Sequence, residues 1–470
     1  MFRLLIPATI AVLVLQGCAV GPDYSEPETE MTETFVEATV DTYVPGPIPA
    51  ALWHGFDDAD LNALIARALA ENTTIAQALA TLNETRALSG LSVYSLFPTV
   101  GVGIDVQRNQ PSSSDPFIPP GVGSTDVYRA GFDAAWEIDL FGRLRRQNQA
   151  IFQRVEADTA ALHAVRLSII AEVAQSYFSL RGAQQRLLVQ QRNLDNLADN
   201  VDILEASLEA GRGTRLDVAR VKSLERSLAA QLPQTQVSIA RAEQRLGVLT
   251  AQGVEDLRSQ LTARRELPIV PDMVPVGTPE DWLRRRPDVQ AAEWRLAEAV
   301  SSIGVEVAEF YPRLDFAGTF GWTGTDGGDL GSSQAERWTF GPLISWRILD
   351  FGRIRQRVRA AEARAEGAYA VFEETLLLAI EEAENGLAGY RAASLTAEAL
   401  GEAVAESQTA STLARLRFDN GVGDYLAVLD AERTQLDLED QHAVAVTNRT
   451  TALAALYKAL GGDFAAPGGP

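Results

Sequence analysis

The chain has 470 residues, of which 46% are hydrophobic and 22% are charged, and its formal net charge at pH 7 is −22. This length supports a large folded core, and the strong negative charge argues against binding to nucleic acid. The three histidines, His54, His163 and His442, are isolated, and no motif has the spacing of a zinc site or of a catalytic nucleophile. We therefore expect no enzymatic activity, no catalytic residue and no metal site.

The first 17 residues have the features of a secretory signal peptide. A basic start at Arg3 is followed by an apolar run from Leu4 to Leu15, which is shorter than the roughly 20 apolar residues of a transmembrane helix. The run leads into a glycine and Cys18, the only cysteine of the chain. This pattern resembles a bacterial lipobox, in which the cysteine is acylated and becomes the first mature residue. We predict cleavage after residues 1–17 and a lipid on Cys18; an ordinary signal cleaved elsewhere is the alternative.

Residues 18–60 are predicted to be a lipidated N-terminal linker, because Ser25 to Pro49 is rich in Pro and Glu and reads as extended chain. Ala19 follows the cysteine. Lipoproteins that stay in the inner membrane of enteric-type bacteria resemble one another in carrying Asp at this position. The resemblance implies transfer to the outer membrane instead.

Residues 61–261 are predicted to form the first of two repeats. An amphipathic segment, 61–96, precedes two strands at about 99–107 and 126–138, in which apolar residues recur at every second position. The apolar positions of the two strands are Val100, Val102, Ile104 and Val106, then Tyr128, Ala130, Phe132, Ala134, Trp136 and Ile138. Each strand has about the 9 to 11 residues that a tilted membrane strand needs.

After the second strand the apolar spacing changes to three and four. Residues 143–210 contain no proline and predict one very long helix, followed by a second helix at 214–250. A helix over 143–210 would be about 100 Å long at 1.5 Å per residue. Sustained spacing of this kind predicts coiled-coil-like packing against neighbouring helices.

A linker at 262–281 separates the first repeat from the second, which is predicted at 282–460 and is followed by a flexible tail at 461–470. The second repeat has the same order of elements as the first. Its predicted elements are an amphipathic segment at 282–310, strands at about 313–322 and 336–346, and long helices at 353–420 and 424–460.

The two repeats are duplicates of one pattern. WEIDLFGRLRR begins at Trp136 and WRILDFGRIRQ begins at Trp346, a separation of 346 − 136 = 210 residues. The same separation relates Gly211 to Gly421 and Gly213 to Gly423. Each glycine pair follows a long helix, and glycine supplies the left-handed conformation that ends a helix and lets the next one run back. These pairs predict two helical hairpin turns.

Four of the seven tryptophans lie on the predicted strands, as expected for outward faces with an aromatic girdle at a lipid boundary. Pro342 predicts an edge or a bulge in the last strand, because proline lacks a ladder donor. A membrane barrel needs at least about eight strands, since an open edge leaves backbone groups unsatisfied in hydrocarbon. Closure therefore requires two, three or four copies. The alternative is two hairpins packed on helices in a soluble domain.

Six segments resemble the TolC-like outer-membrane efflux channels, and more closely their lipidated drug-efflux branch. The segments, which together span almost all of the mature chain, are CAVGPDY from Cys18, ALAENTTIAQALA from Ala68, WEIDLFGR from Trp136, RRPDVQAAEWRLAEA from Arg285, FGPLISWRILDFGR from Phe340 and NGVGDYLAVLDAER from Asn420. The resemblance implies an α+β membrane protein. In it, three chains share one 12-stranded β-barrel, with four strands per chain, and continue as a long periplasmic α-helical barrel.

The same resemblance implies a passive duct in the outer membrane of a Gram-negative bacterium. Its partners would be a periplasmic adaptor (membrane fusion protein) and an inner-membrane pump, of the RND type, besides the outer-membrane lipid. The adaptor would contact the two hairpin turns. These turns consist of Gly211, Arg212, Gly213 and Thr214 in the first hairpin and Gly421, Val422, Gly423 and Asp424 in the second.

Similar channels narrow at this tip to rings of Leu and Asp, and those positions correspond to Leu426 and Asp430. Three converging carboxylates attract cations, and three leucines can dewet a constriction. A core helix residue and a solvated face are the alternatives. Some family members also hold the tip closed with an Asp bonded to a Tyr and an Arg. Asp217 matches the Asp, whereas Phe418 and Gly423 stand where the Tyr and Arg would be.

The missing latch residues would have to be replaced by Arg212, Arg215 or Arg417. Another group of arginines follows each Phe-Gly-Arg motif, near the predicted membrane edge. We hypothesise that some of them pair with lipid phosphates, with salt bridges on the helix surface as the alternative. The group consists of Arg143, Arg145, Arg146, Arg353, Arg355, Arg357 and Arg359.

Two other interpretations stay open at the level of the sequence. The same duct could serve type I protein secretion or metal-ion efflux. A lipid-anchored coiled-coil scaffold without a pore is a further alternative, which the four aromatic-rich strands disfavour. The resemblance implies that selectivity for the cargo resides mainly in the pump and the adaptor.

Overall fold

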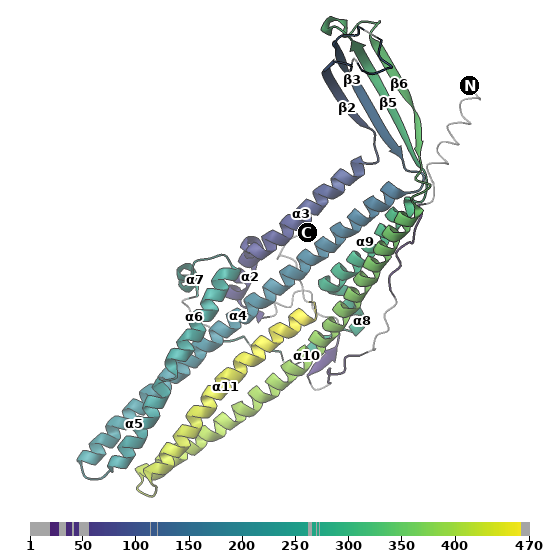
Figure 1. The fold of residues 1–470 in the computed structure, drawn as a ribbon. Helices are drawn as coiled ribbons and strands as arrows, with labels where there is room; N and C mark the ends of the chain where they lie inside the picture. Colours follow the sequence, from purple (N-terminus) through teal and green to yellow (C-terminus); the bar gives the residue numbers. More distant parts are fainter. Residues whose placement is uncertain are drawn as a thin grey trace. The chain divides into compact units, whose positions relative to one another are not determined.

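The computed structural model of the chain describes residues 19–27, 34–39, 42–46, 56–112, 114–119, 121–261, 266–268, 270–271 and 273–461. The predicted signal peptide, Cys18 and residues 462–470 lie outside the described residues. The chain divides into two compact units (Figure 1). The first contains residues 19–27, Thr81–Thr159 and Ala291–Glu373, and the second contains the described parts of Thr29–Ala80, Ala160–Gln290 and Glu374–Pro470.

The first unit contains an antiparallel sheet of four strands in the order β2-β3-β5-β6 (Figure 1). The strands are β2 (Thr99–Asn109), β3 (Thr125–Ile138), β5 (Arg313–Gly324) and β6 (Glu336–Ser345). They confirm the four strands that alternation predicts. Pro342 lies in β6, and β6 is an edge strand, where one side makes no ladder hydrogen bonds within the described chain.

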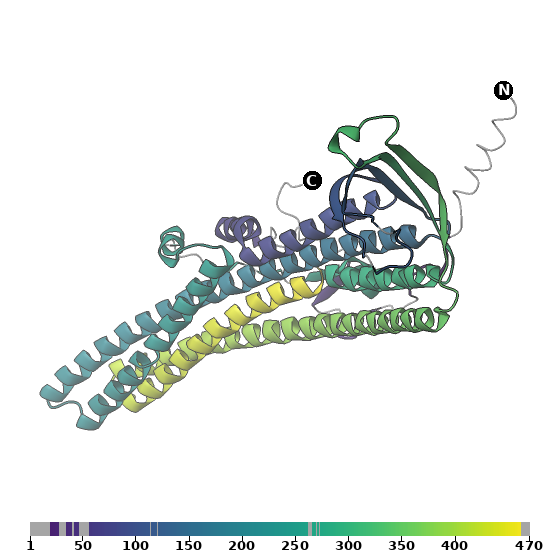
Figure 2. The ribbon, with the colours of Figure 1, turned by 45° about the horizontal axis from the view of Figure 1, so that its top comes forward.

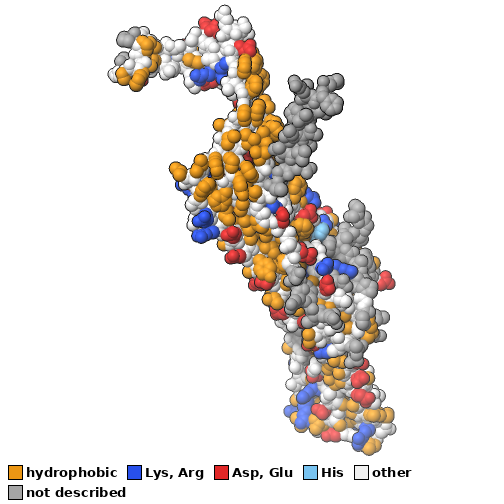
Figure 3. Space-filling view, turned by 90° about the vertical axis from the view of Figure 1, so that its right-hand side faces the viewer, with side chains coloured by type: hydrophobic (Ala, Val, Ile, Leu, Met, Phe, Trp, Pro, Cys, Tyr) orange, Lys and Arg blue, Asp and Glu red, His pale blue; other side chains and the backbone are white. Residues whose placement is uncertain are grey.

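The two faces of this sheet differ in polarity. Residues that are opposite one another in the register share a face. One such row consists of Val102, Phe132, Phe320 and Trp338, which are between 42% and 69% exposed. The adjacent row, on the other face, consists of Gly101, Asp133, Thr319 and Thr339. Hydrophobic side chains are accordingly visible on the surface of the part that carries the sheet (Figure 3). An exposed apolar face opposite a polar face is typical of strands that meet lipid on one side.

Two of the helices are much longer than a domain core requires. Helix α4 (Arg143–Glu209) has 67 residues and α10 (Phe351–Asp419) has 69, and both run through the two units. At 1.5 Å per residue each is about 100 Å long. In the first unit they lie with α3 (Thr73–Tyr94) and α9 (Pro287–Ala308). No helix among the described residues is long and apolar enough to cross a membrane.

The second unit contains two helical hairpins (Figure 2). The first joins α4 to α5 (Arg215–Ala229) and α6 (Leu232–Leu249), and the second joins α10 to α11 (Tyr425–Ala459). The core between the hairpins is apolar. It consists of Leu197, Val201, Leu204, Val221, Leu228, Tyr425, Val428 and Leu429.

The sequence predicts one helix over 214–250, and this prediction is wrong. The structure has a break at Ala230 and Gln231, between α5 and α6. Pro233 lies in the first turn of α6, where a residue without an N–H is tolerated, whereas in a helix interior it would remove a hydrogen bond and clash with the preceding turn. The proline therefore sets the boundary.

Each of the two predicted amphipathic segments contains two helices. Residues 61–96 form α2 (Ala59–Glu71) and α3, and 282–310 form α8 (Pro279–Arg285) and α9. Asn72 separates the first pair, because its side chain accepts hydrogen bonds from the amides of Thr74 at 2.9 Å and Ile75 at 3.2 Å. This is an N-cap, so a new helix begins there. Pro287 begins α9 in the second pair.

The predicted linkers contain regular structure as well. A strand in each, β1 (Tyr43–Pro45) in 18–60 and β4 (Val274–Val276) in 262–281, pairs with the other in parallel. Each has three residues, which is too short for an alternating pattern to be recognised. Helix α7 (Val254–Gln260) ends the first repeat.

Candidate functional site

The first hairpin turn is closed by backbone hydrogen bonds around Gly211. Gly211 has a φ of 74°, a left-handed conformation that side chains of L-residues disfavour. The amides of Gly211, Arg212 and Gly213 donate to carbonyl oxygens of Leu208 and Ser207, at 3.0, 2.8 and 3.1 Å. These bonds satisfy carbonyls at the end of α4, as in a helix C-cap. The predicted turn at 211–214 is confirmed.

The second turn has the same geometry. Gly421 also has a φ of 74°, and its amide donates to the carbonyl oxygen of Phe418 at 2.9 Å. The amide of Val422 donates to the carbonyl oxygen of Arg417 at 3.0 Å. The side chain of Val422 is 72% exposed. Each turn thus presents a short exposed loop between two antiparallel helices.

The helices that leave the two turns begin with different caps. Thr214 accepts a hydrogen bond from the amide of Asp217 at 3.2 Å, and the Asp217 carboxylate accepts one from the amide of Thr214 at 3.2 Å. This reciprocal pair is a capping box. In the second hairpin, the Asp424 carboxylate accepts a single bond from the amide of Leu426 at 3.2 Å.

The predicted gate residues lie together on the exposed face of α11. Leu426 is 44% exposed, and Asp430, one turn further along, is also exposed. The opposite face is buried in the hairpin core through Tyr425, Val428 and Leu429. Among the described residues Asp430 forms no ion pair. Leu426 and Asp430 thus lie on a face of α11 that the described residues leave exposed.

The predicted latch takes a different form within one chain. The carboxylate of Asp217 is occupied by the capping box, and Phe418 packs edge-on against Tyr425 at 5.1 Å between ring centroids. The three arginines proposed as substitutes make no ion pair with a carboxylate anywhere in the described chain. They are Arg212, Arg215 and Arg417.

A charged cluster that the sequence analysis missed joins the two hairpins. The Arg415 guanidinium on α10 lies 2.8 Å from the Glu432 carboxylate on α11, and the Asn200 side-chain amide on α4 donates to the same carboxylate at 2.9 Å. Arg415 also donates to the side-chain oxygen of Asn200. Burial raises the pKa of Glu432, although Arg415 opposes the shift. Burial, together with the charge of Glu432, raises the pKa of Tyr425 to about 12.

A second buried carboxylate lies two turns further along α11. Glu439 is 7% exposed, and four polar side chains donate hydrogen bonds to it, at 2.9 to 3.2 Å. The donors are Arg192, Asn193, Gln408 and Gln435. Burial alone would raise the pKa of Glu439, but the hydrogen bonds from Gln435, Gln408 and Asn193 and the charge of Arg192 lower it.

The sequence does contain a signal for these clusters. Asn193 and Asn200 are seven residues apart on the face of α4 that otherwise carries Leu197 and Leu204, and both asparagines are buried. Polar residues at core positions of paired helices fix their register. A groove of about 590 Å³ in the second unit is lined by residues of both clusters and by Asp419.

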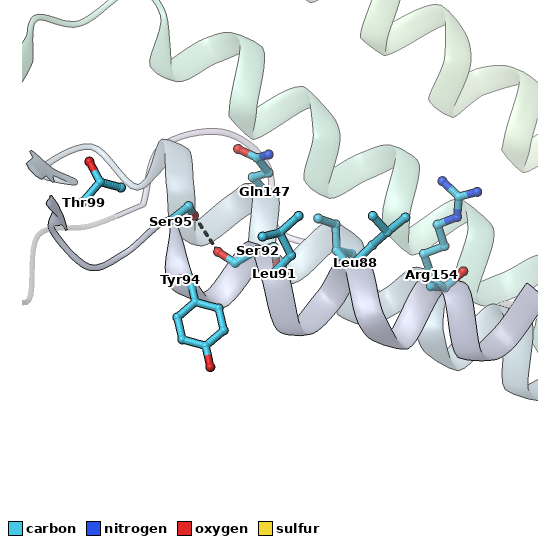
Figure 4. Close-up of a pocket in the computed structure, with 10 residues that line it drawn as sticks. Leu88, Leu91, Ser92, Tyr94, Ser95, Thr99, Gln147 and Arg154 are labelled. Carbon is cyan, nitrogen blue, oxygen red and sulfur yellow. Dashed lines mark hydrogen bonds between the residues drawn. The ribbon is translucent and has the colours of Figure 1, made fainter. Parts of the chain in front are cut away.

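An apolar pocket of about 530 Å³ lies in the first unit, between α3 and α4 (Figure 4). Leu88, Leu91 and Tyr94 line it from α3, and Gln147 and Arg154 line it from α4. The rest of the lining consists of Ile151 and four residues with hydroxyl groups, which are Thr85, Ser92, Ser95 and Thr99. In the described part of the chain, no three His, Cys, Asp or Glu residues are grouped to hold a metal ion.

The arginines after the first Phe-Gly-Arg motif are held by the protein, which favours the salt-bridge alternative for them. Arg143 donates to both carboxylate oxygens of Glu137, at 2.9 and 2.7 Å, and Arg145 pairs with Asp139. Arg146 is buried and pairs with Asp23 at 2.8 Å. In the second repeat, Arg353 lies 3.4 Å from Asp350. Arg355, Arg357 and Arg359 are exposed and form no ion pair within the described chain.

Comparisons with known proteins match nearly the whole chain. Over residues 64–252 and 278–462 it matches the family model described as outer membrane efflux protein. The chain is 29% identical to nodulation protein T of Rhizobium leguminosarum bv. viciae, covering 99% of this chain and 94% of the relative. It is also 29% identical to the toluene efflux pump outer membrane protein TtgI of Pseudomonas putida, covering 97% of each.

A solved structure of the outer-membrane channel OprN has the same fold. It superposes with a TM-score of 0.89 at 36% identity, covering 95% of this chain and all of that one. The chain belongs to the outer membrane efflux protein family.

Proposed function

We propose that this protein is the outer-membrane exit duct of a tripartite efflux system, through which small molecules such as drugs and toxic compounds pass passively to the exterior. The observation that carries the proposal is the four-stranded sheet, with one exposed apolar face and two unpaired edges, β2 and β6. An unpaired edge in hydrocarbon costs several kcal/mol for each unsatisfied backbone group. The sheet is therefore complete only when several chains share it.

The proposed assembly is a homotrimer. Three chains supply twelve strands, and the three pairs of hairpins supply the wall of a helical duct in the periplasm. In this assembly Leu426 and Asp430 of each chain project toward the shared axis and form the gate. The exposed turns at 211–214 and 421–424 are the contacts for a periplasmic adaptor, which connects the duct to an inner-membrane pump of the RND type.

Cys18 is the proposed site of the covalent lipid, which would anchor the N-terminus to the outer membrane after removal of residues 1–17. No other cofactor is proposed. The names of the relatives include toluene efflux and nodulation. This range is in keeping with a duct whose cargo is selected by the pump and the adaptor.

Conductance and oligomeric state of the purified protein test the proposal together. We expect a trimer by light scattering in detergent, and ion conductance after insertion into planar bilayers. A monomer that passes no current would overturn the proposal and would favour a lipid-anchored scaffold.

A second test concerns the transported compounds. Deletion of the gene should increase sensitivity to drugs, dyes or solvents, and re-expression should restore resistance. Unchanged sensitivity to all of them, combined with loss of an exported protein or increased sensitivity to a metal ion, would assign the duct to one of the other two export routes. A Cys18→Ser variant should lose acylation, which mass spectrometry of the N-terminal peptide measures.

A further inference from the structure

The internal repeat relates specific residues of the two halves in the first unit. The indole N–H of Trp136 donates to the carbonyl oxygen of Leu96 at 2.9 Å, and that of Trp346 donates to the carbonyl oxygen of Phe310 at 3.0 Å. The separations are 346 − 136 = 210 and 310 − 96 = 214 residues. Position by position, α10 therefore corresponds to α4 with an offset of 210, and α9 corresponds to α3 with an offset of 214.

Helix α9 is packed on two sides. On one side Ile303 packs against Ala361 and Ala365 of α10, within its own repeat. On the other side α9 meets α4 of the first repeat, where the Ser301 hydroxyl donates to the Gln153 side-chain oxygen at 2.6 Å. The α9–α4 contact thus joins the two repeats of one chain.

The close approach of α9 to α4 depends on Gly304. A Cβ atom at this position would lie 2.9 Å from Cγ of Arg146, so only glycine fits without displacing that side chain. All four residues of the α9–α4 contact are buried: Arg146, Gln153, Ser301 and Gly304.

Among the described residues, helix α3 is packed against α4 on one side and is exposed on the other. It contacts α4 through Ser92 with Asn148, at 2.5 Å, and through Thr85 with Asp158, at 2.6 Å. The positions on α3 that correspond to Ser301 and Gly304 are exposed. They are Ala87 and Gly90, and a Cβ atom on Gly90 would have no neighbour within 4 Å.

Helix α10 has the complementary free face. The residues that correspond to Arg146 and Gln153 of α4 are Gln356 and Ala363, and both are exposed. The single chain therefore contains the α9–α4 contact once. It also contains the two surfaces of a second, equivalent contact, but these surfaces do not touch each other within the chain. One surface lies on α3 and the other on α10.

We propose that α3 of one chain packs against α10 of the next chain, with Gly90 seated against Gln356 and Ala87 beside Ala363, in the way that α9 packs against α4 within the chain. This inference rests on the proposed oligomeric duct and names the surface that closes it. The contact is head to tail, because the two surfaces differ, and repetition of such a contact closes a ring when the rotation permits. The occupant of the free α3 face is a second copy of this chain.

The template contact also predicts that the two positions can be cross-linked. Cγ of Arg146 is one bond from its Cβ, so the Cβ atoms at 146 and 304 come within disulfide range, which is about 3.5 to 4.5 Å. By equivalence, cysteines at 90 and 356 of neighbouring chains should lie at a similar separation. Each chain would donate one cysteine to the chain before it and one to the chain after it.

A double variant, Gly90→Cys with Gln356→Cys, tests the contact in the full-length protein in membranes. Under mild oxidation we expect covalent dimers and trimers on a non-reducing denaturing gel. These bands should disappear with a reducing agent and should be absent from both single variants. The single variants control for bonds that involve Cys18. A matched control is Leu88→Cys with Gln356→Cys, because residue 88 lies about 200° around the helix from residue 90 and should give no cross-link.

The outcomes separate this inference from the proposed function. A trimer by light scattering without the 90–356 cross-link overturns the contact and leaves the duct intact. A monomer without conductance overturns both. The variant Gly90→Leu gives a second measurement. Leucine has a higher helix propensity than glycine, so α3 should be more stable in the isolated chain. The trimer should nevertheless be weaker, because the leucine side chain fills the space that Gln356 of the next chain would occupy. A trimer at least as stable as the original in that variant would also count against the contact.

Discussion

The two helical hairpins of the second unit follow the same sequence pattern and differ in their return helices. Both outgoing helices have nearly the same length, and both turns contain a glycine with φ of 74°. The first return helix is broken before Pro233, whereas α11 continues without a break for 35 residues. A single proline therefore distinguishes the return helices of the two repeats.

The return helices also differ in charge. With the offset of 210, Arg220 and Lys222 of the first hairpin correspond to Asp430 and Glu432 of the second. Lys222 pairs with Glu205 of its own hairpin, whereas Glu432 reaches Asn200 across to the other hairpin. The continuous, acidic helix of the second hairpin therefore carries both the proposed gate residues and the connection between the hairpins.

The largest effect should follow from exchanging the proline between repeats. Ala443 in α11 corresponds to Pro233, and Ala443→Pro would remove a helical hydrogen bond and clash with the preceding turn. We expect the free energy of unfolding to fall by about 3 kcal/mol or more. The matched variant, Pro233→Ala, should change it by well under this amount, because the chain there already has a break. Equal thermal unfolding midpoints for the two variants would contradict the comparison.

The next effect concerns conductance. Leu426→Ala with Asp430→Ala removes the proposed constriction and the ring of carboxylates, so the single-channel conductance should rise several-fold and the preference for cations should fall. The matched control is Leu216→Ala with Arg220→Ala, at the corresponding positions of the first hairpin, where Leu216 is 56% exposed. If planar-bilayer recordings show the same change in conductance for both double variants, the gate cannot be assigned to the second hairpin.

The fold is largely predictable from the sequence, because its main elements have strong periodicity. Alternation of two residues predicts all four strands of the large sheet, and the absence of proline predicts α4 and α10. Strands β1 and β4 have too few residues for a period, and they become visible only through their pairing. The break at Pro233 is missed because the apolar spacing continues on both sides of it.

The site is only partly predictable. The turns follow from Gly211 and Gly421, since left-handed glycines have a recognisable place at helix ends. The cluster of Arg415, Glu432 and Asn200 depends on the rotation of three long helices about their axes, and residue spacing alone does not fix that rotation. The buried asparagines of α4 are the one local indication that polar partners face them.

The helix caps give a smaller expected effect. Thr214→Ala removes the two hydrogen bonds of the Thr214 hydroxyl, one accepted from the amide of Asp217 and one donated to its carboxylate, and Asp424→Ala removes the single bond to the amide of Leu426. Each variant should destabilise its helix start by about 1 kcal/mol, with Thr214→Ala at the upper end. Hydrogen exchange at the amides of each turn measures the local opening free energy. Slower exchange in either variant, or a larger loss at Asp424, would contradict this order.

The smallest expected effect is a pH dependence with opposite signs at two carboxylates of α11. The ordinary pKa of a glutamate side chain is 4.5, and burial raises the pKa of Glu432 above this value. As the pH falls from 7 toward 4.5, the folded chain binds a proton there before the unfolded chain does, so the contribution of Glu432 to stability increases on acidification. Hydrogen bonds lower the pKa of Glu439 despite its burial, so its contribution is present above 4.5 and is lost as the pH falls through its folded value.

Thermal unfolding midpoints of Glu432→Gln and Glu439→Gln, each compared with the unmodified protein across this range, separate the two groups. Between pH 7 and pH 4.5, the unfolding midpoint of the unmodified protein should rise relative to that of Glu432→Gln, because the carboxyl of Glu432 becomes neutral in this range. Relative to Glu439→Gln, the unfolding midpoint of the unmodified protein should fall only below pH 4.5. Because Glu432 accepts hydrogen bonds from α4 and α10 together, parallel curves for Glu432→Gln would mean that its ionisation does not influence the junction between the hairpins.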